Sequence, residues 1–187
     1  MKTTPTSIAA RLSLIAAAGL LGACSSMGSA PMASSQSGLP DPIKVPAGNR
    51  LAWETTTVGG EITYECRDRA QGGGQEWVFV GPEATLNDRA GRRVGRYYGP
   101  PATWESADGS KLTATQVAIA PAAAGSIPLQ LVKANPAMGA GAMTGVSYIQ
   151  RVATKGGVAP ASACDAGSRG RRETVRYQAD YIFYRAG

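Results

Sequence analysis

TVRYQADYIF, residues Thr174–Phe183, is the stretch that decides the fold. Val175, Tyr177, Ala179, Tyr181 and Phe183 alternate with residues that are mostly polar. Side chains that repeat with a period of two point to opposite faces of a β-strand. The stretch therefore predicts a long strand near the end of the chain, with one face in a core.

The same two-residue period recurs along the chain between turns rich in glycine and proline. We expect eight further strands, at residues Arg50–Val58, Ile62–Cys66, Trp77–Val80, Val94–Tyr98, Thr103–Glu105, Lys111–Ala120, Ile127–Leu131 and Val146–Ala153. No stretch of ten or more residues carries a helical apolar stripe with caps. This pattern predicts an all-β domain, an antiparallel sandwich or barrel of about nine strands, over residues 39–187.

The apolar faces of these strands give a predicted core. We expect its buried residues to be Trp53, Tyr64, Trp77, Phe79, Val117, Leu129, Leu131, Ile149, Tyr181 and Phe183.

The first residues resemble a bacterial lipoprotein signal. Lys2 and Arg11 precede a short apolar run that ends in Leu21-Gly22-Ala23-Cys24, which resembles a lipobox. The run is shorter than the roughly twenty residues that a membrane-spanning helix needs. We expect a signal peptide over 1–23 and an acylated Cys24 that holds the protein on a membrane of the bacterial cell envelope, the outer membrane if the host has one. The alternative is an ordinary secretory signal in which Cys24 is incidental.

The residues after Cys24 are small, polar and uncharged, and they lack periodicity. This composition is typical of a flexible linker, so we expect a tether over 24–38.

The chain carries a formal charge of +6, with arginines clustered at 89–96 and 169–172. Nucleic-acid sites interleave aromatic and basic side chains, which these clusters do not. We interpret them as solvated loops and expect no nucleic-acid partner.

The chain contains no histidine, which excludes Ser-His-Asp and Cys-His catalysis and histidine-based zinc sites. The sequence therefore implies no metal and no cofactor. With Cys24 lipidated, two cysteines are left, and paired cysteines are common in exported proteins. We expect a disulfide between Cys66 and Cys164, which would join the Ile62–Cys66 strand to the loop before the last strand. A reactive thiol is the alternative.

Several motifs, taken in order, resemble an exported bacterial and fungal family known as domain of unknown function 3455. They are Val45–Asn49, Trp77–Ala84, Tyr98–Glu105, Asp108–Ser110, Ile127–Pro128, Tyr148–Arg151 and Tyr181–Tyr184. The resemblance runs from about Leu39 to Arg185 and implies no particular activity. Some fungal relatives carry a malate dehydrogenase label, but this chain has neither a βαβ pattern nor a dinucleotide-binding loop, since 139–145 has the wrong glycine spacing.

The best candidate for a binding site is the stretch around Tyr98, Trp104 and Glu105, with Glu83 and Tyr148 as neighbours. Aromatic faces beside a carboxylate are typical of sugar or peptide sites. The alternative is that Trp104 and the tyrosines are core residues.

Two function classes remain open. The first, which we favour, is a non-catalytic envelope domain that binds a ligand or partner, such as a cell-wall glycan. The second is a small glycan hydrolase with paired carboxylates such as Glu83 and Glu105, although no sequence spacing brings those two together.

Overall fold

The computed structural model describes Met1 and residues 36–187. The predicted signal peptide, Cys24 and most of the tether lie outside these residues. Gln36 already contacts the folded domain: its Oε1 accepts a hydrogen bond from the Val45 amide at 2.6 Å. The described residues of the domain thus include Gln36, ahead of the expected start at Leu39.

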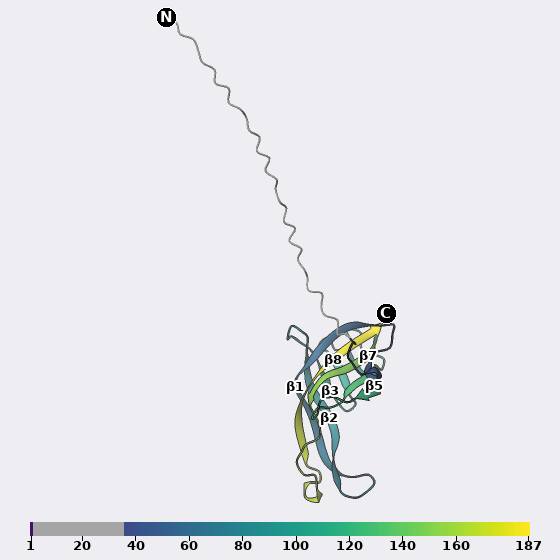
Figure 1. Cartoon of the computed structure of the whole chain (residues 1–187), viewed down its shortest axis with the longest axis vertical. Coiled ribbons are helices and arrows are strands. Elements are labelled where there is room, and N and C mark those ends of the chain that lie inside the picture. The colour runs from purple at the N-terminus through teal and green to yellow at the C-terminus, as the bar shows by residue number, and fades with distance from the viewer. Residues whose placement is uncertain (2–35) are drawn as a thin grey trace. The chain divides into compact units, whose positions relative to one another are not determined.

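Residues 36–187 form an all-β domain, as the two-residue period predicted. Its eight strands are β1 (Asn49–Asp68), β2 (Gln75–Asn87), β3 (Arg93–Tyr98), β4 (Thr103–Ser106), β5 (Lys111–Ala120), β6 (Leu129–Ala134), β7 (Val146–Gly156) and β8 (Arg172–Ala186). Each strand pairs antiparallel with the next, and β8 returns to pair with β1, which closes a barrel. Figure 1 shows the long β1 and β8 side by side. Two single-turn 3₁₀ helices, η1 (Asp41–Ile43) and η2 (Ala166–Ser168), complete the described elements.

The described part has eight strands rather than nine because the first two predicted strands are one. β1 continues through Gly59 and Gly60, where its register against β2 and β8 shifts. A side-chain carbon on Gly60 would lie 2.5 Å from the Tyr177 carbonyl oxygen. Glycine is therefore needed at this bend, because β1 and β8 approach each other too closely for any larger residue.

The barrel interior is filled by apolar and aromatic side chains. Tyr64, Leu131, Ile149, Tyr181 and Phe183 are buried, as predicted. Leu131 belongs to a second, outer cluster, whereas the other four belong to the main core. Trp53, Trp77 and Leu129 are half-buried.

The predicted burial of Phe79 and Val117 is wrong, since their exposed fractions are 52% and 54%. β2 pairs with β3 only from Glu83 onward. Phe79 lies before that point, where the edge of β2 that would face β3 has no neighbouring strand among the described pairs. Val117 lies at a register shift between Gln116 and Ala118, where a bulge changes the direction of the side chain.

The outer cluster attaches the segment before β1 to the outside of the barrel. Ile43 and Val45 pack against Leu131, Ile182 and Tyr184. The buried amide of Gln150 donates a hydrogen bond to the Ile43 carbonyl at 2.6 Å and accepts one from the Tyr184 hydroxyl at 2.8 Å.

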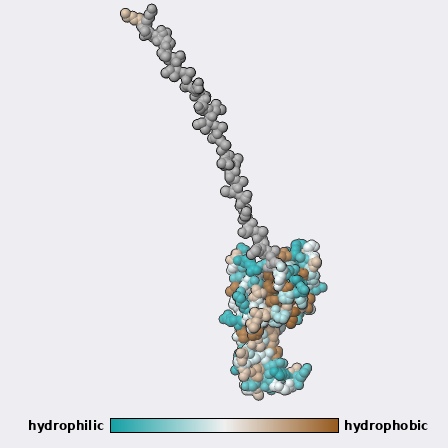
Figure 2. Space-filling model, in the orientation of Figure 1, coloured by the Kyte–Doolittle hydropathy of each residue, from teal (hydrophilic) through white to brown (hydrophobic). Residues whose placement is uncertain are grey.

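Cys66 and Cys164 form the predicted disulfide, with their Cα atoms 5.5 Å apart. It joins β1 to the loop before β8, as expected. This end of the domain, made by the β1–β2 hairpin and that loop, is mostly hydrophilic on the face seen in Figure 2. No helix among the described residues is long and apolar enough to cross a membrane.

Candidate functional site

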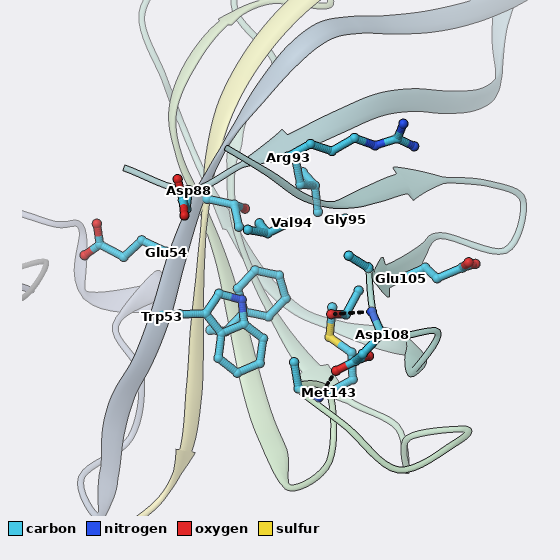
Figure 3. A pocket seen from close by; sticks show the side chains of 15 residues that line it. Trp53, Glu54, Asp88, Arg93, Val94, Gly95, Glu105, Asp108 and Met143 are labelled. Carbon is cyan, nitrogen blue, oxygen red and sulfur yellow. Dashed lines mark hydrogen bonds between the residues drawn. The ribbon is translucent and has the colours of Figure 1, made fainter. Parts of the chain in front are cut away.

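A cavity of about 470 Å³ opens at the other end of the barrel (Figure 3). Asn49 at the start of β1 pairs with Ala186 at the end of β8 near this end. Three connections supply its rim, namely β2–β3, β4–β5 and β6–β7. An eight-stranded barrel has room for side chains or for one small ligand. Here side chains fill the middle, and the space lies near the mouth.

Two stacked aromatic rings form one wall of the cavity. The rings of Trp53 and Phe183, on the neighbouring strands β1 and β8, lie 4.6 Å apart at an angle of 12°. The Arg185 guanidinium lies 5.3 Å from the centre of the Trp53 ring. Apolar side chains continue the lining, at Leu86, Val94, Ala107 and Met143. The surface that a ligand would meet beside the rings is therefore mainly apolar.

Asp108 connects two of the rim loops. One carboxylate oxygen accepts from the Ser110 amide at 2.9 Å and the Ser110 hydroxyl at 2.6 Å, and the other accepts from the Ala142 amide at 2.7 Å. The Ser110 hydroxyl in turn accepts from the Met143 amide at 3.1 Å. The hydrogen bonds that Asp108 accepts lower its pKa to about 2, and the one from the Ser110 hydroxyl contributes most. Asp108 is thus ionised at neutral pH and holds the loop that carries Met143 against the β4–β5 turn.

The other carboxylates at the rim are paired with arginines. Glu54 pairs with Arg89, Asp88 with Arg92 at 2.7 Å, and Glu105 with Arg96 at 3.0 Å. The hydrogen bond to Glu54 raises the pKa of Arg89. Figure 3 shows the side chains of Glu54 and Glu105 directed away from the Trp53 ring. Their charges therefore lie outside the aromatic part of the cavity.

Three of the predicted site residues, Glu83, Tyr98 and Glu105, lie on the outer face of the barrel. The Tyr98 hydroxyl donates to Glu105 at 2.7 Å, and the Arg96 guanidinium lies 4.5 Å from the centre of the Tyr98 ring. Tyr98 is the cross-strand partner of Glu83. The Tyr98 hydroxyl and Arg96 lower the pKa of Glu105, and the hydrogen bond to Glu105 raises the pKa of Tyr98. This polar cluster shares only Glu105 with the lining of the cavity.

Trp104 points the other way, into the core. Only 2% of it is exposed, and its ring packs 4.7 Å from Tyr97 and 5.6 Å from Tyr181. It therefore offers no open ring face to a ligand, which favours the alternative interpretation of Trp104 as a core residue. Successive residues of a strand face opposite sides, so Trp104 and Glu105 cannot share a site on one face.

Tyr148 lies apart from the rest of the predicted site. It packs with the outer cluster around Ile43 and Tyr184. The structure therefore brings Glu83, Tyr98 and Glu105 together but separates them from Trp104 and Tyr148.

Sequence reasoning missed the cavity itself. Trp53 and Phe183 carried a signal, the strand period, but it predicted only that they face a core. Asp108 and Met143 lie in loops far apart in the sequence, and only closure of the barrel brings them together. Among the described residues, no three cysteine, aspartate or glutamate side chains are grouped as metal ligands.

No curated protein and no solved structure gives a significant match to the chain. A family model described as protein of unknown function, DUF3455, matches residues 46–185, which include β1 to β7 and all of β8 except its last residue, Ala186. The chain therefore belongs to the DUF3455 family, as its motifs predicted.

Proposed function

We propose that this protein is an exported lipoprotein of the bacterial cell envelope, whose barrel binds a small, largely apolar molecule without transforming it. The cavity walled by Trp53 and Phe183 carries the binding part of this proposal. Ligand sites of this kind are concave and mostly apolar, with few polar groups. The cavity favours an apolar molecule over a glycan, because a sugar needs many polar partners along its length.

The anchoring part rests on sequence. The lipobox-like Leu21-Gly22-Ala23-Cys24 supports acylation of Cys24, and the disulfide between Cys66 and Cys164 is typical of a protein folded outside the cytoplasm. The glycan hydrolase alternative has no comparable support. Glu83 does not line the cavity, and Glu105 is occupied by Arg96 and Tyr98.

Binding can be tested with N-phenyl-naphthylamine, a neutral apolar dye whose emission rises when it leaves water. We expect saturable binding to the purified full-length protein. Ala107→Trp should abolish it, because Ala107 is exposed and lines the cavity, so a large ring there fills the mouth without entering the core. Ala124→Trp, at an exposed loop residue outside the lining, is the matched control and should bind normally. Equal binding by both variants, or none by the wild type, would contradict the proposal.

Anchoring can be tested by growing the native host with labelled palmitate. The label should appear on the wild-type protein and be absent from Cys24→Ser. A mature wild-type protein that is released from the membrane without label would show that the anchor is wrong.

A further inference from the structure

Thr55 supplies a polar group to the cavity that the fold itself does not use. It follows Trp53 by two residues on the inner face of β1, lines the cavity, and is only 1% exposed. Its hydroxyl is buried and has no hydrogen-bond partner among the described residues. A buried polar group without a partner is unfavourable, and it calls for an explanation.

Thr57, the next threonine on the inner face of β1, has a hydroxyl that does form a hydrogen bond. The Thr57 hydroxyl accepts a hydrogen bond from the Ala179 amide of β8 at 2.9 Å. Thr57 does not line the cavity, whereas Thr55 does. Of these two threonines, the one whose hydroxyl has no partner, Thr55, is thus the one that a ligand can reach.

The charges around the cavity favour an uncharged ligand. Glu54, Asp88 and Glu105 are each paired with an arginine. Arg93 also lines the cavity, but Figure 3 shows its guanidinium directed away from the Trp53 ring. Asp108 places a carboxylate at the rim that would repel an anion, and Arg185 beside the Trp53 ring would repel a cation. A charged ligand would also lose its hydration against the apolar walls.

We propose that the ligand is a neutral, mainly apolar molecule with one hydrogen-bonding oxygen, such as a carbonyl, and that the Thr55 hydroxyl donates to this oxygen. This inference rests on the proposed function and names the ligand chemistry of the same cavity. Rings or aliphatic groups of the ligand pack against Trp53 and Phe183, and the Thr55 hydroxyl fixes its orientation.

Two probes of nearly equal shape separate the hydrogen bond from apolar packing. They are acetylnaphthalene, which has a carbonyl oxygen, and isopropenylnaphthalene, in which a methylene group replaces that oxygen. Calorimetric titration of the full-length protein should show acetylnaphthalene binding roughly tenfold more tightly, the ratio expected for one net hydrogen bond. Thr55→Val should reduce this ratio to one or below, because the bound carbonyl then has no donor, and should not weaken the binding of isopropenylnaphthalene, which also shows that the variant is folded.

Two further variants complete the test. Thr55→Ser keeps the hydroxyl and should keep the preference. Thr154→Val removes another buried hydroxyl that has no partner among the described residues but does not line the cavity, so it should behave as the wild type. Equal binding of the two probes to the wild type, or a preference that survives in Thr55→Val, would overturn the Thr55 inference while leaving the apolar cavity in place. If neither probe binds the wild type, the proposed function fails, and the inference fails with it.

Discussion

Trp53 and Trp104 occupy different environments in this barrel: Trp53 lines the cavity and Trp104 lies in the packed core. Trp53 stacks on Phe183 at the cavity wall, whereas Trp104 is enclosed between Tyr97 and Tyr181. The strand period predicted an inward face for Trp53, but it does not tell how far along the barrel a residue lies. Because that distance decides whether a ring meets a cavity or the packed core, the sequence alone could not show that Trp53 lines the cavity and Trp104 does not.

Trp104→Ala should therefore act on stability. Removing a large ring from a packed core leaves a void, and such changes cost about 3–5 kcal/mol of unfolding free energy. Phe79→Ala is the control: its ring is half exposed and packs edge-on against Tyr64, with the ring centres 6.1 Å apart, so its cost should be smaller, about 1 kcal/mol. Urea denaturation of both variants gives the comparison. Near-wild-type stability of Trp104→Ala would contradict its place in the core.

Asp108 gives the cavity rim a defined acid sensitivity. Its pKa is about 2 in the folded protein against an ordinary value of 3.8, so the folded state takes up this proton less readily than the unfolded chain. The stabilisation from Asp108 is fully present above about pH 4 and is lost as the pH falls toward 2.

Asp108→Asn should thus make the unfolding free energy depend less on pH between pH 4 and pH 2. The amide cannot accept all three hydrogen bonds as the carboxylate does, so the variant should be less stable at neutral pH and lose less between pH 4 and pH 2. Thermal denaturation across that range measures both effects. A profile parallel to that of the wild type would show that Asp108 does not hold the loops.

At the scale of the elements, the period of two located the strands well but not where they begin and end. The stretch around Tyr181 lies in β8 as expected, and the predicted strand at Lys111–Ala120 coincides with β5. The join of the first two strands was missed because Gly59-Gly60 is typical of a turn, whereas here it makes a bend within β1. The exposure of Val117 was missed because a bulge cannot be recognised from the alternation of apolar and polar residues in the sequence.

The bend at Gly60 depends on the lack of a side chain. Gly60→Ala would place a carbon 2.5 Å from the Tyr177 carbonyl oxygen and 2.9 Å from its ring, which forces β1 and β8 apart. We expect a loss of about 1–3 kcal/mol in unfolding free energy, as in other overpacked sites. The control is Gly59→Asn, since asparagine tolerates the positive φ of 62° and nothing lies within 4 Å. If the two variants were equally stable, the close approach would not be what requires glycine.

Closure of the whole barrel creates the cavity. The β4–β5 turn with Asp108 and the β6–β7 loop with Met143 meet the start of β1 and the end of β8 only because β8 pairs with β1. The pairing of successive strands is readily expected from the sequence, but which loops meet at one end follows from strand tilt and register. The fold class and the disulfide could therefore be predicted, whereas the cavity could not.

The three tryptophans allow the proposal that an apolar ligand occupies this cavity to be tested in one spectrum. Trp53 lines the cavity, Trp104 lies in the core, and Trp77 donates its indole hydrogen to the Ser162 carbonyl near the disulfide end. Indole ¹⁵N labelling should give one resonance for each ring, assigned with Trp→Phe variants. Titration with acetylnaphthalene should shift the Trp53 signal strongly and the Trp77 signal hardly at all. A spectrum in which the Trp53 signal does not shift, or in which the Trp77 signal shifts most, would show that the ligand does not occupy this cavity.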